Sequence, residues 1–268
     1  MILLDLGNTR LKLAALRDGE IADVSAIAHR DNHAFHAQLL AELGRRRESG
    51  VAAVAWLASV HHGAALDEVL AALGGHGFSI RHITQARSRD DLRLAYADVT
   101  ELGVDRWLAM LGVRSGIGGD LLLVSAGTAL TIDLIDASGR HHGGCIAPSP
   151  MRMVDGLRQA ASHLPQPPLS AMLAPRSLFA GNTMDGLAAG AQGATLGLVR
   201  QAAGEAREQL GRSPTLVLTG GGAAALIATL AGHPEAIHFK YAVLQGLSRL
   251  ASEARSGTAE GTSACARC

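Results

Sequence analysis

Several kinds of residue are scarce in this chain of 268 residues, and each scarcity excludes a class of protein. Three cysteines are too few for a disulfide scaffold. The 24 basic and 24 acidic residues cancel, so no net field draws the chain onto nucleic acid or an anionic membrane. No apolar run reaches the roughly 18 residues of a spanning helix, and the start lacks the features of a secretory signal. We expect a cytoplasmic protein with no membrane and no nucleic acid partner.

Cysteine and histidine pairs occur, but their surroundings do not indicate a metal site. Cys265 and Cys268 have redox or zinc spacing, yet they close a polar stretch rich in Ser, Gly and Ala. We expect residues 256–268 to form a disordered tail. The pairs His61-His62 and His141-His142 lack a third ligand at helical or loop spacing, and we interpret them as surface loop residues.

The order of apolar segments predicts a duplicated fold. Residues 1–84 give the order β-β-β-α-β-α-β, which describes a ribonuclease-H-like lobe, and the same pattern restarts at residue 121. We therefore predict an α/β fold of two ribonuclease-H-like lobes, at 1–115 and 116–255, with a nucleotide cleft between them. Strands are expected at 1–6, 11–16, 21–27, 51–60, 79–84, 121–127, 130–136 and 140–146, and helices at 33–45, 64–73 and 107–114.

Three features lie further along the chain. Pro165, Pro167 and Pro168 predict a loop. In the segment 186–199, glycines recur at helix-face spacing, which indicates either close helix packing or the lining of a cleft. Residues 216–222 read as a strand that runs into a glycine turn, a typical place for a ligand.

Two glycine corners carry the main chemical signal. One reads Asp5-Leu6-Gly7-Asn8-Thr9-Arg10-Leu11-Lys12 and the other Ser125-Ala-Gly-Thr-Ala-Leu-Thr-Ile-Asp133, and each follows an apolar strand. Glycine lets backbone N–H groups approach an anion closely, and the hydroxyls of Thr9 and Thr128 can donate to phosphate oxygens. The pair predicts a duplicated phosphate clamp, and therefore nucleotide chemistry.

Charged residues in the first corner suit a metal-bound phosphate. Asp5 stands where the strand ends, and with phosphates nearby it is expected to bind Mg²⁺, directly or through water. Arg10 and Lys12 alternate with Leu11, so both cations lie on one face of the strand. Only Lys12 and Lys240 are lysines, which adds weight to the first. The alternative is a hairpin with a solvated basic face.

A second candidate lies at Gly103-Val104-Asp105-Arg106, at the opening of an apolar helix. Asp105 could accept a proton from an alcohol that attacks a γ-phosphate, and Arg106 could anchor an acidic substrate. The alternative is an N-cap aspartate with Arg106 on the helix surface. Spacing alone does not decide between them.

Together these motifs resemble type III pantothenate kinase, from residue 1 to about 250. The family belongs to the superfamily of acetate and sugar kinases, heat-shock ATPases and actin, with two ribonuclease-H-like lobes and ATP in the cleft. The motifs are the two corners, Tyr96 with Leu102-Gly-Val-Asp-Arg106, Gly143-Gly-Cys-Ile-Ala-Pro148, Gly181-Asn-Thr-Met-Asp185 and Leu218-Thr-Gly-Gly221.

The resemblance implies ATP-dependent phosphorylation of pantothenate to 4′-phosphopantothenate, the first step of coenzyme A biosynthesis. It implies that ATP binds Asp5 to Lys12 and Thr128, and that Asp105 accepts the proton. It also implies Mg²⁺, a monovalent cation (K⁺ or NH₄⁺), and a homodimer whose subunits share the pantothenate pocket. The implied pantothenate-binding residues are Tyr96, Gly103, Val104, Asp105, Arg106 and Thr183.

Departures from the family pattern leave two other functions open. Ser125 stands where the family has an aspartate that ligates potassium, so dependence on a monovalent cation is in question. Val99 and Ser149 replace a usual proline and glycine in loops. The alternatives are another small-molecule kinase of the superfamily and a non-catalytic ATP-binding regulator. The balanced charge argues against a regulator that contacts DNA.

Overall fold

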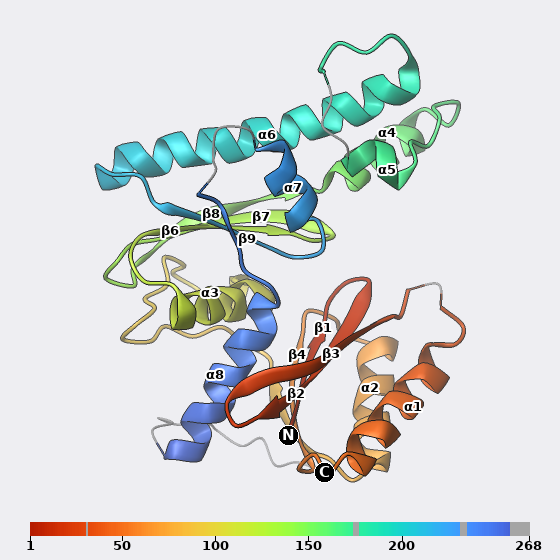
Figure 1. The fold of residues 1–268 in the computed structure, drawn as a ribbon, viewed down its shortest axis with the longest axis vertical. Coiled ribbons are helices and arrows are strands. Elements are labelled where there is room, and N and C mark those ends of the chain that lie inside the picture. The colour runs from red at the N-terminus through yellow and green to blue at the C-terminus, as the bar shows by residue number, and fades with distance from the viewer. Residues whose placement is uncertain (31, 174–176, 231–234, 258–268) are drawn as a thin grey trace. The chain divides into compact units, whose positions relative to one another are not determined.

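The computed structural model describes residues 1–30, 32–173, 177–230 and 235–257, and its chain forms two compact units (Figure 1). Unit 1 comprises Met1–Ala86, Asp98–Gly116 and the stretch that begins at Ala242, and unit 2 comprises Arg87–Ala97 and Ile117–Tyr241. The chain therefore leaves unit 1 twice and returns to it twice. None of the helices in the described ranges is long and apolar enough to cross a membrane.

Unit 1 is built on a five-stranded sheet with the order β3-β2-β1-β4-β5. Strands β1, β2 and β3 pair antiparallel, whereas β4 and β5 run parallel to β1. All five residues of β1 are buried, because helices cover both faces of the sheet. The elements are β1 (Ile2–Leu6), β2 (Arg10–Arg17), β3 (Glu20–Ala28), α1 (Phe35–Glu48), β4 (Val54–Ser59), α2 (Ala64–Gly75), β5 (Ser79–Ile83), the 3₁₀ helix η1 (Val99–Glu101), α3 (Val104–Gly116) and α8 (Ala242–Ser256).

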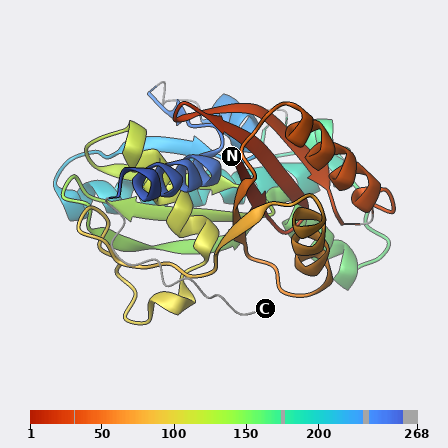
Figure 2. The same ribbon diagram turned by 90° about the horizontal axis from the view of Figure 1, so that it is seen from below.

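The two faces of β1 carry different kinds of side chain. Leu4 and Leu6 belong to a core cluster that they share with residues of α1 and α2, such as Leu39 and Val69. Side chains alternate along a strand, so Asp5 lies on the opposite face. Helix α8 packs against β1 and α3, and α3 against β4. Figure 2 shows α3 and α8 side by side, as it does α1 and α2.

Helices α3 and α8 meet backbone to backbone. A Cβ atom added to Gly112 would overlap the carbonyl oxygen of Ala242, and one added to Gly246 would overlap the carbonyl oxygen of Leu108. Only glycine permits so close an approach from both helices. This crossing ties the last helix of the chain to unit 1.

Unit 2 repeats the topology of unit 1. Its sheet has the order β10-β9-β6-β7-β8, so that β6, β7, β8, β9 and β10 correspond to β1, β2, β3, β4 and β5. Pairing is again antiparallel from β6 through β8 and parallel for β9 and β10. The elements are β6 (Leu121–Ala126), β7 (Ala129–Ile135), β8 (His141–Pro148), α4 (Pro150–Ala160), α5 (Leu169–Leu173), α6 (Thr183–Leu210), β9 (Thr215–Thr219), α7 (Ala223–Thr229) and β10 (Ile237–His238).

The predicted α/β fold and its duplication are confirmed, with corrections of detail. The helix predicted at 107–114 begins three residues earlier, at Val104. The glycine-containing segment 186–199 lies within the 28-residue helix α6, and the proline stretch is a loop. Helices α4, α5, α7 and α8 were not foreseen. The division into lobes at 1–115 and 116–255 stays a prediction, and Cys265 and Cys268 lie outside the described residues.

Candidate active site

The first glycine corner is the tight turn between β1 and β2. The N–H of Gly7 donates to the carbonyl oxygen of Arg10 at 3.1 Å, which closes the turn. Asp5 and Lys12 are cross-strand partners, and the Lys12 ammonium lies 2.9 Å from the Asp5 carboxylate. Asp5 is buried, whereas Arg10 is exposed. The corner therefore presents one buried acid paired with one partly exposed base.

His29, which the sequence reasoning missed, supports this corner from the end of β3. Its Nε2 lies 2.8 Å from the carbonyl oxygen of Gly7, and its backbone N–H donates to Thr9 at 3.2 Å. A carbonyl oxygen only accepts, so Nε2 carries the hydrogen. The ring also meets His61 edge to face, with centroids 5.1 Å apart. Only the pairing of β2 with β3 brings His29 to Gly7, and no local motif announces it.

Asp105 lies in the first turn of α3. The helix begins at Val104, and the N–H of Trp107 donates to the carbonyl oxygen of Gly103 at 3.1 Å. Asp105 is thus inside the helix, and the alternative reading as its N-cap is wrong. Its Oδ1 accepts the backbone N–H of Arg106 at 2.8 Å. An added Cβ at Gly103 would lie only 2.7 Å from that oxygen, so glycine leaves room for the carboxylate.

The electrostatic surroundings of Asp105 suit a proton acceptor. Burial raises the pKa of the Asp105 carboxyl above its ordinary value; the hydrogen bond from Arg106 opposes the shift, and the charge of Asp5 adds to it. Arg106 itself is 6% exposed, so the alternative that places it on the helix surface is wrong. Val104 is buried as well. Unit 1 therefore brings Asp5, Lys12, Asp105 and Arg106 into one compact body.

The second corner, between β6 and β7, is a similar turn that is one residue shorter than the first. The N–H of Gly127 donates to the carbonyl oxygen of Ala129 at 3.0 Å, and Ser125 pairs with Thr131 across the strands. Ser125 and Thr128 are both half-buried. Ser125 and Asp5 hold the position two residues before their corner glycines, but a hydroxyl replaces the carboxylate. The predicted duplication thus extends to the corners.

The glycine turn after β9 packs directly on this corner. Gly220 has a φ of +91°, and an added Cβ would come within 2.5 Å of the carbonyl oxygen of Ala126. The N–H of Gly222 donates to the same oxygen at 2.9 Å. The sequence prediction of a strand that ends in a glycine turn is confirmed.

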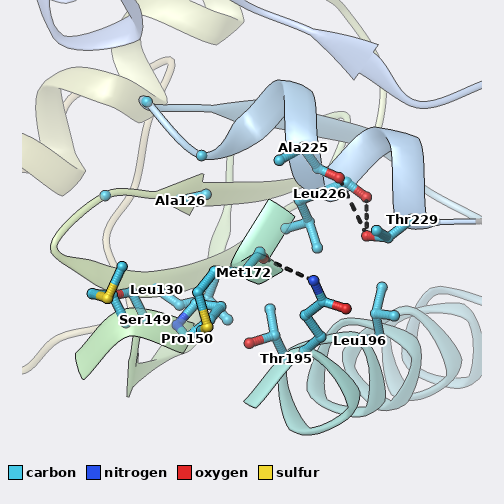
Figure 3. Close-up of a pocket in the computed structure, with 15 residues that line it drawn as sticks. Ala126, Leu130, Ser149, Pro150, Met172, Thr195, Leu196, Ala225, Leu226 and Thr229 are labelled. Carbon is cyan, nitrogen blue, oxygen red and sulfur yellow. Dashed lines mark hydrogen bonds between the residues drawn. The ribbon is translucent and has the colours of Figure 1, made fainter. Parts of the chain in front are cut away.

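A pocket of about 270 Å³ opens beside these two turns (Figure 3). Its wall is largely apolar, with Leu196 of α6 and Leu226 of α7 on facing helices. Gln192 and Thr195 bring polar groups, and Gln192 donates to the carbonyl oxygen of Met172 at 2.8 Å. The further lining comes from Ala126, Gly127, Leu130, Ser149, Pro150, Met151, Gly221, Gly222, Ala225 and Thr229.

A groove between α4 and α6 contains Thr183. Thr183 is exposed in the first turn of α6, whose N-cap Asn182 accepts the N–H of Asp185 at 2.9 Å. Gly186 and Gly190 lie in the same groove, so the glycine face of α6 lines a cavity, while Gly193 packs against Leu178. The groove measures about 460 Å³ and also involves Met153, Leu157, Leu187 and Ala191.

Tyr96 belongs to unit 2, apart in the sequence from the rest of that unit. Its half-buried ring stacks on the imidazole of His141, which is buried in β8. The interpretation of His141 as a surface loop residue is therefore wrong, because β8 carries its side chain into the interior. His61 and His62 do lie in a loop. Tyr96, Ser125, Thr128 and Thr183 thus share unit 2.

Within the described residues, no group of three or more His, Cys, Asp or Glu side chains is arranged to hold a metal ion. Asp5 at the first corner lies near enough to Asp105 for its charge to raise the pKa of the Asp105 carboxyl. This donor set fits an ion that takes most of its ligands from a bound phosphate and from water, as Mg²⁺ does.

Comparisons with known proteins identify one family. A family profile for type III pantothenate kinase matches residues 1–205. The type III pantothenate kinase of Stenotrophomonas maltophilia is 36% identical over 255 residues, which are 95% of this chain and 98% of the relative. That of Xylella fastidiosa is 38% identical over 246 residues, 92% of this chain and 95% of the relative.

Solved structures of lower identity share the fold. A Campylobacter jejuni protein of the Baf family of transcriptional activators superposes with a TM-score of 0.58 at 20% identity, over 96% of this chain and all of the other. The activator of 2-hydroxyisocaproyl-CoA dehydratase from Clostridium difficile, solved with bound ADPNP, gives 0.50 at 13% identity, over 98% and 99%. These likenesses concern architecture alone.

Proposed function

The chain belongs to the type III pantothenate kinase family, whose members phosphorylate pantothenate with ATP in coenzyme A biosynthesis, and we propose how its residues divide this work. The observation that carries the proposal is the environment of Asp105. Asp105 is a half-buried carboxylate whose pKa is raised by burial, held in the first turn of a helix beside Arg106 and affected by the charge of Asp5. Its surroundings combine a proton acceptor with charged groups that can bind a carboxylate and a phosphate.

Asp105 is the proton acceptor of the reaction. As the 4′-hydroxyl of pantothenate attacks the γ-phosphorus of ATP, its proton passes to the Asp105 carboxylate. The raised pKa makes this carboxylate a better base than an exposed aspartate. Gly103 serves this role by leaving space for the carboxylate oxygen.

The two glycine corners bind the phosphates of ATP. In the first corner, which spans Leu6 to Leu11, the turn residues Asn8 and Thr9 and the ammonium of Lys12 supply donors, and in the second Thr128 supplies a hydroxyl. The apolar pocket beside Gly127 and Gly222 suits the flat adenine base. Arg10 is exposed and free to turn toward a phosphate.

Asp5 is the residue that would hold Mg²⁺, directly or through water. Bound there, the ion would neutralise charge on the phosphate oxygens. Because Lys12 pairs with Asp5, its ammonium already lies beside the carboxylate that would hold the ion. Ser125 marks the position of the monovalent cation; its neutral hydroxyl contributes one oxygen ligand without charge, so we propose weak dependence on K⁺ or NH₄⁺.

Pantothenate is held at its acidic end by Arg106, whose guanidinium can pair a carboxylate with two hydrogen bonds. Tyr96 and Thr183 complete the recognition, with the backbone of Gly103 and Val104. Tyr96 offers a ring and a hydroxyl, and Thr183 offers a hydroxyl at the mouth of the α4–α6 groove.

We also propose a homodimer and a cytoplasmic location, where ATP is supplied. The support for the dimer is apolar surface around the α4–α6 groove: Phe179 is 94% exposed, Leu178 63% and Leu157 52%. Exposed apolar clusters of this kind mark protein interfaces. A Phe179→Asp variant is expected to sediment as a monomer, whereas an unchanged dimer mass would show that the interface lies elsewhere.

Steady-state kinetics with pantothenate and ATP test the catalytic assignment. Asp105→Asn keeps the shape of the side chain but removes the base, and we expect kcat to fall by about 10² to 10⁴. Asp98→Asn is the matched control, because Asp98 is exposed and caps only the short helix η1. Near-normal turnover by Asp105→Asn at saturating pantothenate would show that another group accepts the proton.

A substrate that lacks the carboxylate tests Arg106. Arg106→Met is expected to raise the KM for pantothenate strongly, but to change little for pantothenyl alcohol, which has no acid to pair. An equal loss with both substrates would place the carboxylate away from Arg106.

A further inference from the structure

The segment that carries Tyr96 has no regular secondary structure of its own, and it is fixed to unit 2 through the β7–β8 hairpin. The N–H of Arg93 donates to the carbonyl oxygen of Gly139 at 2.8 Å, and the N–H of His141 donates to the carbonyl oxygen of Arg93 at 2.8 Å. The Arg93 guanidinium also donates to Ser138 at 3.0 Å. These bonds secure the backbone three residues before Tyr96, but the ring of Tyr96 needs its own support.

That support is the imidazole of His141. The rings of Tyr96 and His141 are parallel within 7°, with centroids 6.0 Å apart, which is an offset stack. His141 is 1% exposed and Tyr96 is half-buried, so one face of the tyrosine ring rests on a buried ring.

His141 is in turn held by Asp133 of β7. Its Nε2 lies 3.1 Å from Oδ1 of Asp133, and both side chains are almost wholly buried, at 0% and 2% exposed. The hydrogen bond between these two side chains fixes the plane of the imidazole ring. Asp133 lies on the face of the sheet opposite the core residues Ile132 and Leu134.

Packing alone does not explain a histidine at this position. Among the described residues, the other nitrogen of His141, Nδ1, is buried without a hydrogen-bond partner, which is unfavourable. An apolar ring would fill the same space without that cost. The pair with Asp133 gives what an apolar ring lacks: a fixed ring plane for the tyrosine to lie on.

We propose that His141, oriented by Asp133, is a positioning residue that sets the ring of Tyr96 for pantothenate recognition. This inference rests on the proposed role of Tyr96 and deepens it. His141 does not touch the substrate, so its effect passes through Tyr96. Loss of the imidazole removes the stacking partner of the tyrosine ring, which weakens pantothenate binding and leaves ATP binding intact.

A double-mutant cycle with the full-length enzyme tests this. His141→Ala is expected to raise the KM for pantothenate about 10-fold or more, with the KM for ATP changed by less than about 2-fold. In the background of Tyr96→Ala the same substitution is expected to have almost no further effect. His141→Phe restores a flat ring without the bond to Asp133, and is expected to recover part of the loss.

His142→Ala is the matched control. His142 neighbours His141 in β8, but it pairs with Asp136 at 2.8 Å and with Gln209 at 2.9 Å, away from Tyr96. It is expected to leave both KM values unchanged.

Four results would overturn the inference. Additive effects of His141→Ala and Tyr96→Ala would show that the histidine acts independently of the tyrosine. An equal rise in both KM values would indicate general damage to unit 2, as would a failure of both His141→Ala and His141→Phe to fold. A Tyr96→Ala variant with a normal KM for pantothenate would refute the proposed role of Tyr96 itself, and the inference with it.

Discussion

Substitution of Gly103 by alanine would test how closely the position of Asp105 controls the reaction. The change adds a single methyl group outside the reacting atoms. Its Cβ would lie 2.7 Å from Oδ1 of Asp105, whereas ordinary contacts begin near 3.4 Å. The carboxylate must therefore move by about 0.7 Å, or turn away from the N–H of Arg106 that holds it now.

The expected loss follows from that displacement. Misplacement of a reacting group by about 1 Å costs about 10²-fold in rate, so we expect kcat to fall by about 10-fold to 100-fold. That range corresponds to about 1.4 to 2.8 kcal/mol of activation free energy. The effect on folding is smaller, because alanine in place of glycine at the start of a helix costs only about 1 kcal/mol.

A coupled assay of ADP release at saturating pantothenate and ATP measures kcat, and thermal unfolding measures stability. Gly44→Ala in α1 is the control, since no atom lies within 4 Å of an added Cβ there, and full activity is expected. The fall in kcat of Asp105→Asn is the largest fall that Gly103→Ala can cause by displacing the Asp105 carboxylate. A Gly103→Ala enzyme that folds normally and keeps kcat within 2-fold would refute the argument that the carboxylate is held in one place.

The remaining predictions concern pH, ATP binding and stability. Asp105 must be ionised to accept the proton and its pKa is raised, so kcat/KM should fall as the pH drops through that pKa, at a higher pH than for an ordinary aspartate. In a pH–rate profile, Asp5→Asn should move this acidic decline of kcat/KM to lower pH, because it removes a charge that raises the pKa of Asp105. His29→Ala removes the bond to the corner carbonyl and should raise the KM for ATP by about 2-fold to 10-fold, with the KM for pantothenate unchanged. Gly246→Ala should lower the free energy of unfolding in urea by about 3 kcal/mol, whereas Gly204→Ala, with open space around it, should not. The first expectation would be contradicted if Asp5→Asn left the acidic decline of kcat/KM at the same pH, and the second if His29→Ala left the KM for ATP unchanged. The third would be contradicted if Gly246→Ala and Gly204→Ala had equal free energies of unfolding.

Local patterns carry much of the architecture in this chain. The strands that flank each corner alternate with turn residues, so they could be predicted within a few residues, as β1 at Ile2–Leu6 and β6 at Leu121–Ala126 show. The corners could be found because glycine is typical of turns where the chain reverses, as at Gly7 and Gly127. The duplication then followed from the repeat of the same order of elements, and the sheet orders confirm it.

Features that depend on distant partners could not be foreseen. Gly112 and Gly246 touch across two helices, yet each looks like an ordinary helical glycine in the sequence. The sequence indicates a surface loop at His141 because the pair His141-His142 lacks a third metal ligand, whereas the register of β8 buries His141 against Asp133. His29 contacts Gly7 only because β3 pairs with β2, which in turn pairs with β1. Such contacts are set by tertiary structure and leave no local pattern.

The close crossing of α3 and α8 has a consequence for biosynthesis. Residues 1–86 of unit 1 are translated before unit 2, but helix α8 starts at Ala242, after the whole of unit 2 has been translated. Until then the glycine face of α3 has no partner, and a nascent chain that stalls or stops early exposes it. Ribosome-bound nascent chains that are truncated before α8 should therefore be much more sensitive to protease than nascent chains that include α8.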